Sequence, residues 1–142
     1  MTNVTLQQIA AHLRQIDVCQ FTTVTTDDVP TTRPMSNNRD VDYDGTTYFY
    51  TSDQQELVSH IEGNPKVALG YSNGSLFISI SGQAELIREE SALEEHWVPE
   101  LDRWFPQGTR TPGIVMIKVT GERIKYWQNE ESGELALETA TA

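Results

Sequence analysis

The sequence predicts a mainly β protein of the α+β class, built on a small antiparallel barrel. Six segments of strand length are separated by turn signals, and three further segments have helical periodicity. The pair Asn73-Gly74 between two strand segments is a type I′ hairpin signal. Strands joined by hairpins, with helices inserted between some of them, favour a small barrel. The pattern alone also fits another compact α+β fold.

The predicted strands contain most of the β-branched and aromatic residues of the chain. Pro34 lies in the second strand and cannot donate to a ladder, so we expect it at a sheet edge or where the pairing breaks. Gly82 in the fifth strand predicts a bend or bulge. The predicted strands cover residues 18–26, 31–37, 46–52, 66–71, 75–87 and 114–119, with a continuation to residue 127.

Three helices are predicted, over residues 5–16, 54–62 and 89–105. Thr5 can cap the first helix, and either Ser52 or Asp53 can cap the second. The third helix carries an apolar stripe, which core packing or a dimer interface explains better than a cofactor site. The residues of this stripe are Leu93, Trp97, Leu101 and Trp104.

A chain of 142 residues is most naturally one domain. We expect residues 1–128 to form it and the acidic residues 129–142 to be a loosely ordered tail. Cys19 is the single cysteine, so an internal disulfide and a cysteine-based zinc site are excluded. Its apolar neighbours predict a buried structural thiol.

The net charge of −11 argues against nucleic acid and against an anionic membrane surface as partners. No apolar stretch approaches the roughly 20 residues that a membrane-spanning helix needs. The first residues lack the basic and apolar regions of a secretory signal. We therefore expect a cytoplasmic protein.

Two motifs stand out for chemistry, Thr32-Arg33-Pro34-Met35-Ser36 and Tyr48-Phe49-Tyr50-Thr51-Ser52. An arginine in one strand and a Thr-Ser pair at the end of the next can form a small anion pocket on a sheet. Arginine suits a phosphate because its planar guanidinium group bonds bidentately. No nucleophile–base pair and no metal-ligand spacing accompany these motifs, so we expect no catalytic side chain and no metal site.

Further motifs follow in order, and together the set resembles the general stress protein branch of the pyridoxamine 5'-phosphate oxidase-like FMN-binding split barrels. The resemblance covers roughly residues 5–128. It implies a six-stranded antiparallel Greek-key split β-barrel with flanking helices, and a homodimer with FMN at the subunit interface. It also implies a flavin-dependent oxidoreductase, whose substrate and electron donor the sequence does not specify. The additional motifs are Asn64-Pro65, Ile80-Ser81-Gly82-Gln83-Ala84, Trp104-Phe105-Pro106-Gln107-Gly108 and Tyr126-Trp127.

The resemblance assigns roles to residues position by position. Arg33 would reach the FMN phosphate or ribityl chain, and Ser52 would add a hydroxyl near the phosphate. Trp104 would close the pocket, either in the same subunit or from the partner. The remaining residues would line the pocket around the isoalloxazine ring, and they are Pro34, Met35, Ser36, Tyr50 and Thr51.

The chain departs from the family pattern after the second motif. Where relatives place a serine and then a lysine, often preceded by arginine, this sequence has Gln55, Glu56 and Leu57. Arg39 or Arg110 would have to supply a compensating charge. Two alternatives therefore stand beside a flavoenzyme. One is a non-enzymatic split-barrel dimer that has lost or weakened FMN binding, and the other is a protein with a deazaflavin cofactor.

Overall fold

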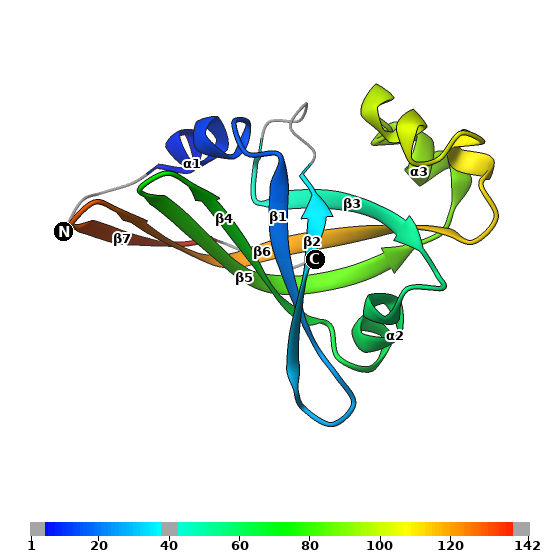
Figure 1. Cartoon of the computed structure of the whole chain (residues 1–142), viewed down its shortest axis with the longest axis horizontal. Helices are drawn as coiled ribbons and strands as arrows, with labels where there is room; N and C mark the ends of the chain where they lie inside the picture. Colours follow the sequence, from blue (N-terminus) through cyan, green and yellow to red (C-terminus); the bar gives the residue numbers. More distant parts are fainter. Residues whose placement is uncertain (1–4, 38–42, 138–142) are drawn as a thin grey trace.

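A computed structural model describes residues 5–37 and 43–137, and its centre is a seven-stranded antiparallel sheet (Figure 1). The strands are β1 (Val18–Val24), β2 (Pro30–Ser36), β3 (Thr46–Ser52), β4 (Lys66–Asn73), β5 (Leu76–Ile87), β6 (Ile114–Gln128) and β7 (Glu131–Ala136). Hydrogen-bonded neighbours follow the order β2-β1-β4-β5-β6-β3, and β7 pairs with β6.

The sheet curls without closing. Among the described residues, β2 pairs only with β1 and β3 only with β6, so the two edge strands are not joined. The split barrel that the sequence predicts is therefore confirmed. Pro34 is confirmed in an edge strand, where its missing N–H removes no bond from the interior of the sheet.

The bulge predicted at Gly82 is also confirmed. The register between β5 and β6 shifts between Ser81 and Gly82. A Cβ atom added to Gly82 would lie 2.1 Å from the Thr120 carbonyl oxygen, so only glycine allows this close approach. The bulge bends the two longest strands, and this curvature brings the edge strands toward each other.

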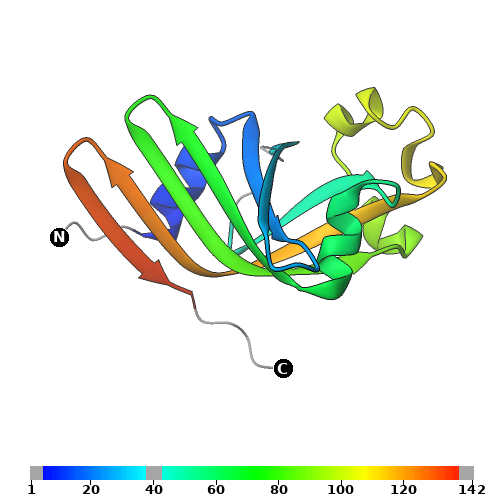
Figure 2. The same cartoon turned by 60° about the horizontal axis from the view of Figure 1, so that its bottom comes forward.

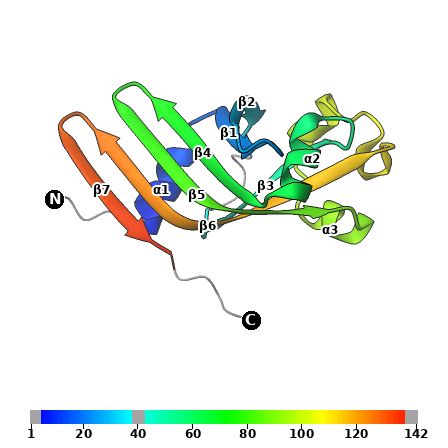
Figure 3. The same cartoon turned by 90° about the horizontal axis from the view of Figure 1, so that it is seen from below.

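The helices lie at the two ends of the barrel. Helix α1 (Leu6–Leu13) is at one end, with Thr5 and Gln8 forming a capping box as predicted. Helices α2 (Glu56–Gly63) and α3 (Glu90–Glu95) lie at the other end, where α2 packs against β1 and β5 (Figures 1 and 3). None of the helices in the described ranges has the length and apolar character that a membrane crossing requires.

Two helix predictions need correction. The helix expected over residues 89–105 is broken into α3 and a 3₁₀ helix, η1 (Pro99–Arg103). Pro99 causes the break, because the residue before a proline avoids helical geometry, and Val98 is extended with φ −120° and ψ 149°. A second 3₁₀ helix, η2 (Gly108–Arg110), precedes β6. Helix α2 begins at Glu56, and no side chain caps it.

The expected tail is wrong for residues 131–136, which form β7. Strand β6 has 15 residues, and β3 pairs only with its first part, Ile114–Thr120. The rest of that edge is left for β7, which pairs with residues 123–128 in a hairpin (Figure 2). Leu135 and Leu137 pack against the core. Residues 138–142 lie outside the described residues.

The inside of the curled sheet is the main hydrophobic core, and Cys19 is fully buried in it as predicted. Burial raises the pKa of the Cys19 thiol to about 12, although hydrogen bonds to Tyr71 and the Gly70 backbone oppose the shift. A second cluster of Leu93, Ile114 and Met116 lies under α3. It fixes the segment between β5 and β6 against the sheet.

Candidate functional site

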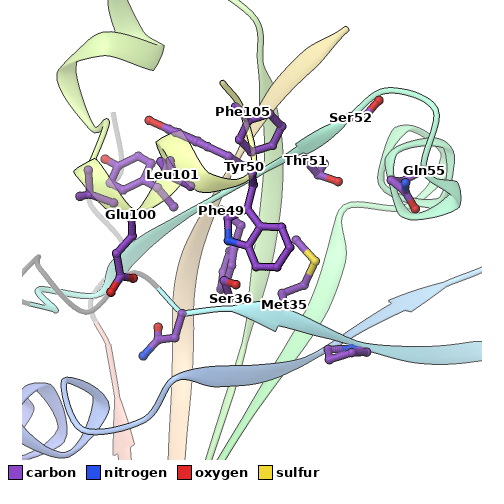
Figure 4. Close-up of a pocket in the computed structure, with 15 residues that line it drawn as sticks. Met35, Ser36, Phe49, Tyr50, Thr51, Ser52, Gln55, Glu100, Leu101 and Phe105 are labelled. Carbon is purple, nitrogen blue, oxygen red and sulfur yellow. The ribbon is translucent and has the colours of Figure 1, made fainter. Parts of the chain in front are cut away.

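A cavity of about 390 Å³ lies between the edge strands β2 and β3, at the opening of the barrel. The segment around η1 forms its third wall (Figure 4). Figure 4 shows Ser52 and Gln55 on one side of Tyr50, with Glu100 and Leu101 on the other. The lining residues are Pro34, Met35, Ser36, Asn37, Tyr48, Phe49, Tyr50, Thr51, Ser52, Gln55, Val98, Glu100, Leu101, Trp104 and Phe105.

The β2 wall is anchored at its end by Asn37. This side chain is 6% exposed, and its Nδ2 donates to the carbonyl oxygens of Leu13 and Ile16, both at 2.8 Å. These bonds satisfy carbonyl groups at the C-terminal end of α1 and after it. Met35 packs against the core from the same strand. The rim formed by β2 is therefore held in place by the helix at the far end of the barrel.

The β3 wall is aromatic, and residues of α3 and of the segment after it hold its tyrosine side chains in place. The Tyr50 hydroxyl donates to the Leu93 carbonyl oxygen at 2.8 Å, and its ring stacks on Trp97 with centroids 5.1 Å apart. Tyr48 stacks on His96 with centroids 3.7 Å apart. Burial raises the pKa of Tyr50, so its hydroxyl stays protonated and keeps donating at neutral pH.

The third wall comes from residues 98–105. Trp97 Nε1 donates to Asp102 Oδ1 at 3.0 Å, which ties η1 to the aromatic group behind β3. Trp104 is 61% exposed, and the Arg103 guanidinium carbon lies 5.5 Å from its ring centroid. A large indole at the mouth of an apolar cavity is available to cover a planar ligand.

Arg33 takes a different position from the one that the resemblance implies, since it is not among the residues that line the cavity. Its Nη1 donates to the Phe21 carbonyl oxygen at 3.2 Å and to Thr23 Oγ1 at 2.8 Å. Burial lowers the pKa of Arg33, and the nearby Glu56 carboxylate opposes that shift. Contact between Arg33 and a phosphate stays a prediction.

The three departures from the family pattern point in different directions. Gln55 lines the cavity, Glu56 is exposed in the first turn of α2, and Leu57 is only 3% exposed in the core. The core packing predicted for Leu57 is confirmed. Arg110 pairs with Glu90, its Nε 3.4 Å from Oε1, and it does not line the cavity. Arg39 lies outside the described residues.

These groups fit one part of an FMN molecule and not the other. An apolar slot with aromatic walls and two strand edges that are unpaired among the described residues suits a flavin ring, which needs apolar contact and backbone donors and acceptors. A phosphate needs a cation, yet the one charged side chain among the described lining residues is Glu100. The ring part fits, and the phosphate part does not.

Sequence reasoning predicted seven of the fifteen described residues that line the cavity and, of the wall formed by residues 98–105, only Trp104. Of the predicted residues, Pro34, Met35, Ser36, Tyr50, Thr51, Ser52 and Trp104 line the cavity, and Arg33 does not. Strand alternation could have added Tyr48, which shares a face with Tyr50. The spacing of Leu101 and Phe105 placed both in a helix but could not show which surface they cover. The lining residues that were not predicted are Asn37, Tyr48, Phe49, Gln55, Val98, Glu100, Leu101 and Phe105.

Comparison with solved structures supports this fold. A Clostridium acetobutylicum protein related to general stress protein 26 of B. subtilis has a TM-score of 0.81 at 15% identity, over 93% of this chain and 94% of that chain. The general stress FMN/FAD binding protein of Xanthomonas citri has a TM-score of 0.75 at 19% identity, over 96% and 97%.

A third structure is more similar in sequence. It is a Listeria innocua protein named as a candidate pyridoxamine 5'-phosphate oxidase, with 32% identity over 85% of this chain and 96% of that chain, and a TM-score of 0.70. No curated protein sequence matches the chain. Residues 5–142 match the model of the family described as "Pyridoxamine 5'-phosphate oxidase like". The order of motifs, the split barrel and these matches agree, and the chain belongs to the pyridoxamine 5'-phosphate oxidase like family.

Proposed function

We propose that this protein binds a flavin, with the isoalloxazine ring in the cavity between β2 and β3, and acts as a flavin-dependent oxidoreductase of the general stress protein type. One observation carries the proposal. The cavity lies where the barrel is split, so two strand edges that have no sheet partner within residues 5–37 and 43–137 face an apolar slot. Such edges carry backbone N–H and C=O groups that a ring with donors and acceptors on its rim can use.

The residues of this chain would bind and shield the ring. Met35 and the β2 backbone would form one side of the slot, and Tyr50 and Trp104 are placed to give it aromatic contacts. A bound flavin would supply the redox chemistry, which no side chain of the cavity is needed to provide. FMN is the flavin that the family resemblance implies, and the X. citri protein is named for binding FMN or FAD.

The partner in this proposal is a second copy of the chain in the cytoplasm. The resemblance to homodimeric split barrels motivates it, and the exposure of Trp104 at the cavity mouth is consistent with cover from another subunit. Light scattering after size exclusion gives the mass directly. A monomer at the concentrations used for flavin titration would contradict the dimer while leaving the ring site to be tested by itself.

The flavin proposal is tested by titrating the purified protein with lumiflavin, riboflavin and FMN and following flavin fluorescence. At least one of these ligands should bind at micromolar concentration. Trp104→Ala should weaken that binding by about tenfold, since stacking on an aromatic ring contributes about 1–3 kcal/mol. Trp127→Ala is the matched control, because Trp127 is also exposed, at 43%, but does not line the cavity. Absence of binding by all three ligands would contradict the proposal.

A second candidate function is a non-enzymatic dimer with weakened FMN binding. The absence of a cationic side chain among the described lining residues favours it. Mixing the flavin-loaded protein with NADH or NADPH under anaerobic conditions separates the two candidates. An oxidoreductase loses its visible flavin absorbance as NADH or NADPH reduces the flavin and regains it when an added electron acceptor reoxidises the flavin, whereas a binding protein keeps its spectrum.

A further inference from the structure

We infer that the cavity selects the flavin ring without its phosphate, so that riboflavin binds at least as tightly as FMN. The inference rests on the proposed function, because it specifies the ligand of the same site. It is argued from the charges around the side of the cavity where Ser52 and Gln55 lie (Figure 4).

The groups at this side of the cavity are polar or anionic. Ser52 and Gln55 line it with a hydroxyl and an amide. Glu56 occupies the first turn of α2, and Asp53 lies in the connection from β3 to α2, both exposed. A phosphate monoester carries a charge of about −1.5 to −2 at neutral pH, so these carboxylates repel it. The net charge of −11 adds a long-range repulsion.

Arg33, the cation near this side among the described residues, already makes hydrogen bonds within the protein. Arg33 is close enough to Glu56 for the carboxylate to affect its pKa, but its guanidinium donates to Thr23 and to the Phe21 carbonyl oxygen. Turning toward a phosphate would break the bond to a fully buried hydroxyl. That hydroxyl would keep only its contact with His60 Nδ1, and the loss of a charged hydrogen bond offsets part of the gain from the new contact.

The N-terminus of α2 does not supply the positive charge that a phosphate would need. The Gln54 backbone N–H donates to Ser52 Oγ at 3.2 Å, and the Gln55 N–H donates to the Ser52 carbonyl oxygen at 3.0 Å, so these two backbone donors already have local partners. Glu56 already places a negative charge beside the N–H groups of the first turn. The ring slot is apolar, and the side with Ser52 and Gln55 offers no charged donor among the described lining residues. The ring is thus favoured and the phosphate is not.

The test compares riboflavin and FMN by fluorescence titration at low and at high salt. We expect the dissociation constant of FMN to equal that of riboflavin or to exceed it by up to about tenfold. Because salt screens repulsion, FMN binding should tighten as the ionic strength rises, while riboflavin binding stays constant. A cationic phosphate clamp would give the opposite salt dependence.

The charge at Glu56 is then reversed. Glu56→Lys should tighten FMN by about tenfold, as expected for a new charged partner, and leave riboflavin within about twofold. Glu62→Lys makes the same charge change in the last turn of the same helix, whereas Glu56 lies in the first turn beside the lining residue Gln55, and Glu62→Lys should change FMN binding by less than about twofold. Glu56→Gln tests the repulsion without adding a cation and should tighten FMN by a smaller factor.

Each result decides between the two proposals. FMN binding that is measurably tighter than riboflavin binding, or no response of FMN to Glu56→Lys in a folded protein, would overturn this inference and leave flavin binding in place. Failure of lumiflavin, riboflavin and FMN alike would overturn the proposed function itself. FMN binding that is equal to or weaker than riboflavin binding, and that Glu56→Lys selectively tightens, supports both the proposed flavin binding and the selection against the phosphate.

Discussion

Arg33 donates a hydrogen bond from Nη1 to the hydroxyl of Thr23 at 2.8 Å, and Thr23 is fully buried. The same hydroxyl lies 2.9 Å from His60 Nδ1. Since arginine can only donate, the Thr23 oxygen accepts from it, and the His60 tautomer sets which atom donates in the second bond. One buried oxygen thus connects β1, β2 and α2 behind the cavity.

This connection predicts that Thr23→Val destabilises the protein. Valine keeps the shape of threonine but removes the acceptor of Arg33 and the partner of His60. An unsatisfied buried group costs about 1–3 kcal/mol, so the free energy of unfolding should fall by about that amount. Urea unfolding followed by circular dichroism measures it. The matched control is Thr22→Val, whose hydroxyl bonds Thr32 at an exposed position. Equal stability of the two variants would disprove the structural role of Thr23.

Substitution by lysine should destabilise the protein at Leu57 but not at Gln55, where it should tighten FMN binding. Leu57 is 3% exposed in the core, so Leu57→Lys removes apolar packing and introduces a charge, and we expect a loss of about 3–5 kcal/mol. Gln55 is exposed and lines the cavity, so Gln55→Lys should change stability by less than about 0.5 kcal/mol and tighten FMN. Thermal unfolding and flavin titration of the two variants provide the measurements. Tight FMN binding by a stable Leu57→Lys protein would show that α2 has a different rotation.

The raised pKa of the buried Cys19 thiol predicts that the protein loses stability at alkaline pH. Its pKa is raised from 9.0 to about 12 by burial, so above pH 9 the unfolded chain loses a proton that the folded protein retains. The unfolded state then binds fewer protons, and stability falls as the pH rises from 9 toward 12, by up to about 1.4 kcal/mol per pH unit. Burial raises the pKa of Tyr71 as well, in the same direction. Urea unfolding across this range should show a shallower decline for Cys19→Ala, and an unchanged decline would exclude the thiol as a cause.

Much of the fold could be predicted because it depends on local signals. Alternation along the strands, the missing N–H of Pro34 and the absent Cβ of Gly82 each act within one strand pair, and each is found where the sequence predicts it. Strand β7 was missed for the opposite reason. Its sequence is weakly apolar, and it forms because β6 extends beyond β3 and leaves an edge to pair with.

The cavity residues also divide into those that local sequence signals predict and those that depend on the fold. The order of the motifs was enough to bring Met35, Tyr50 and Trp104 into one site. The direction of side chains in α2 depended on where the helix starts, because successive residues are rotated by about 100° around its axis. A start at Glu56 turns Leu57 into the core and leaves Gln55 at the cavity, which no local pattern could decide.

The sequence by itself determined six of the seven strands, the family and seven of the residues that line the cavity. The tertiary structure decided the charge at the side of that slot where Ser52 and Gln55 lie. Arg33 had two possible partners, a ligand phosphate or the buried Thr23 hydroxyl, and the choice depends on packing between β1, β2 and α2. A buried polar group must be satisfied within the fold. The arginine that the sequence assigns to a ligand is therefore bonded to the protein itself.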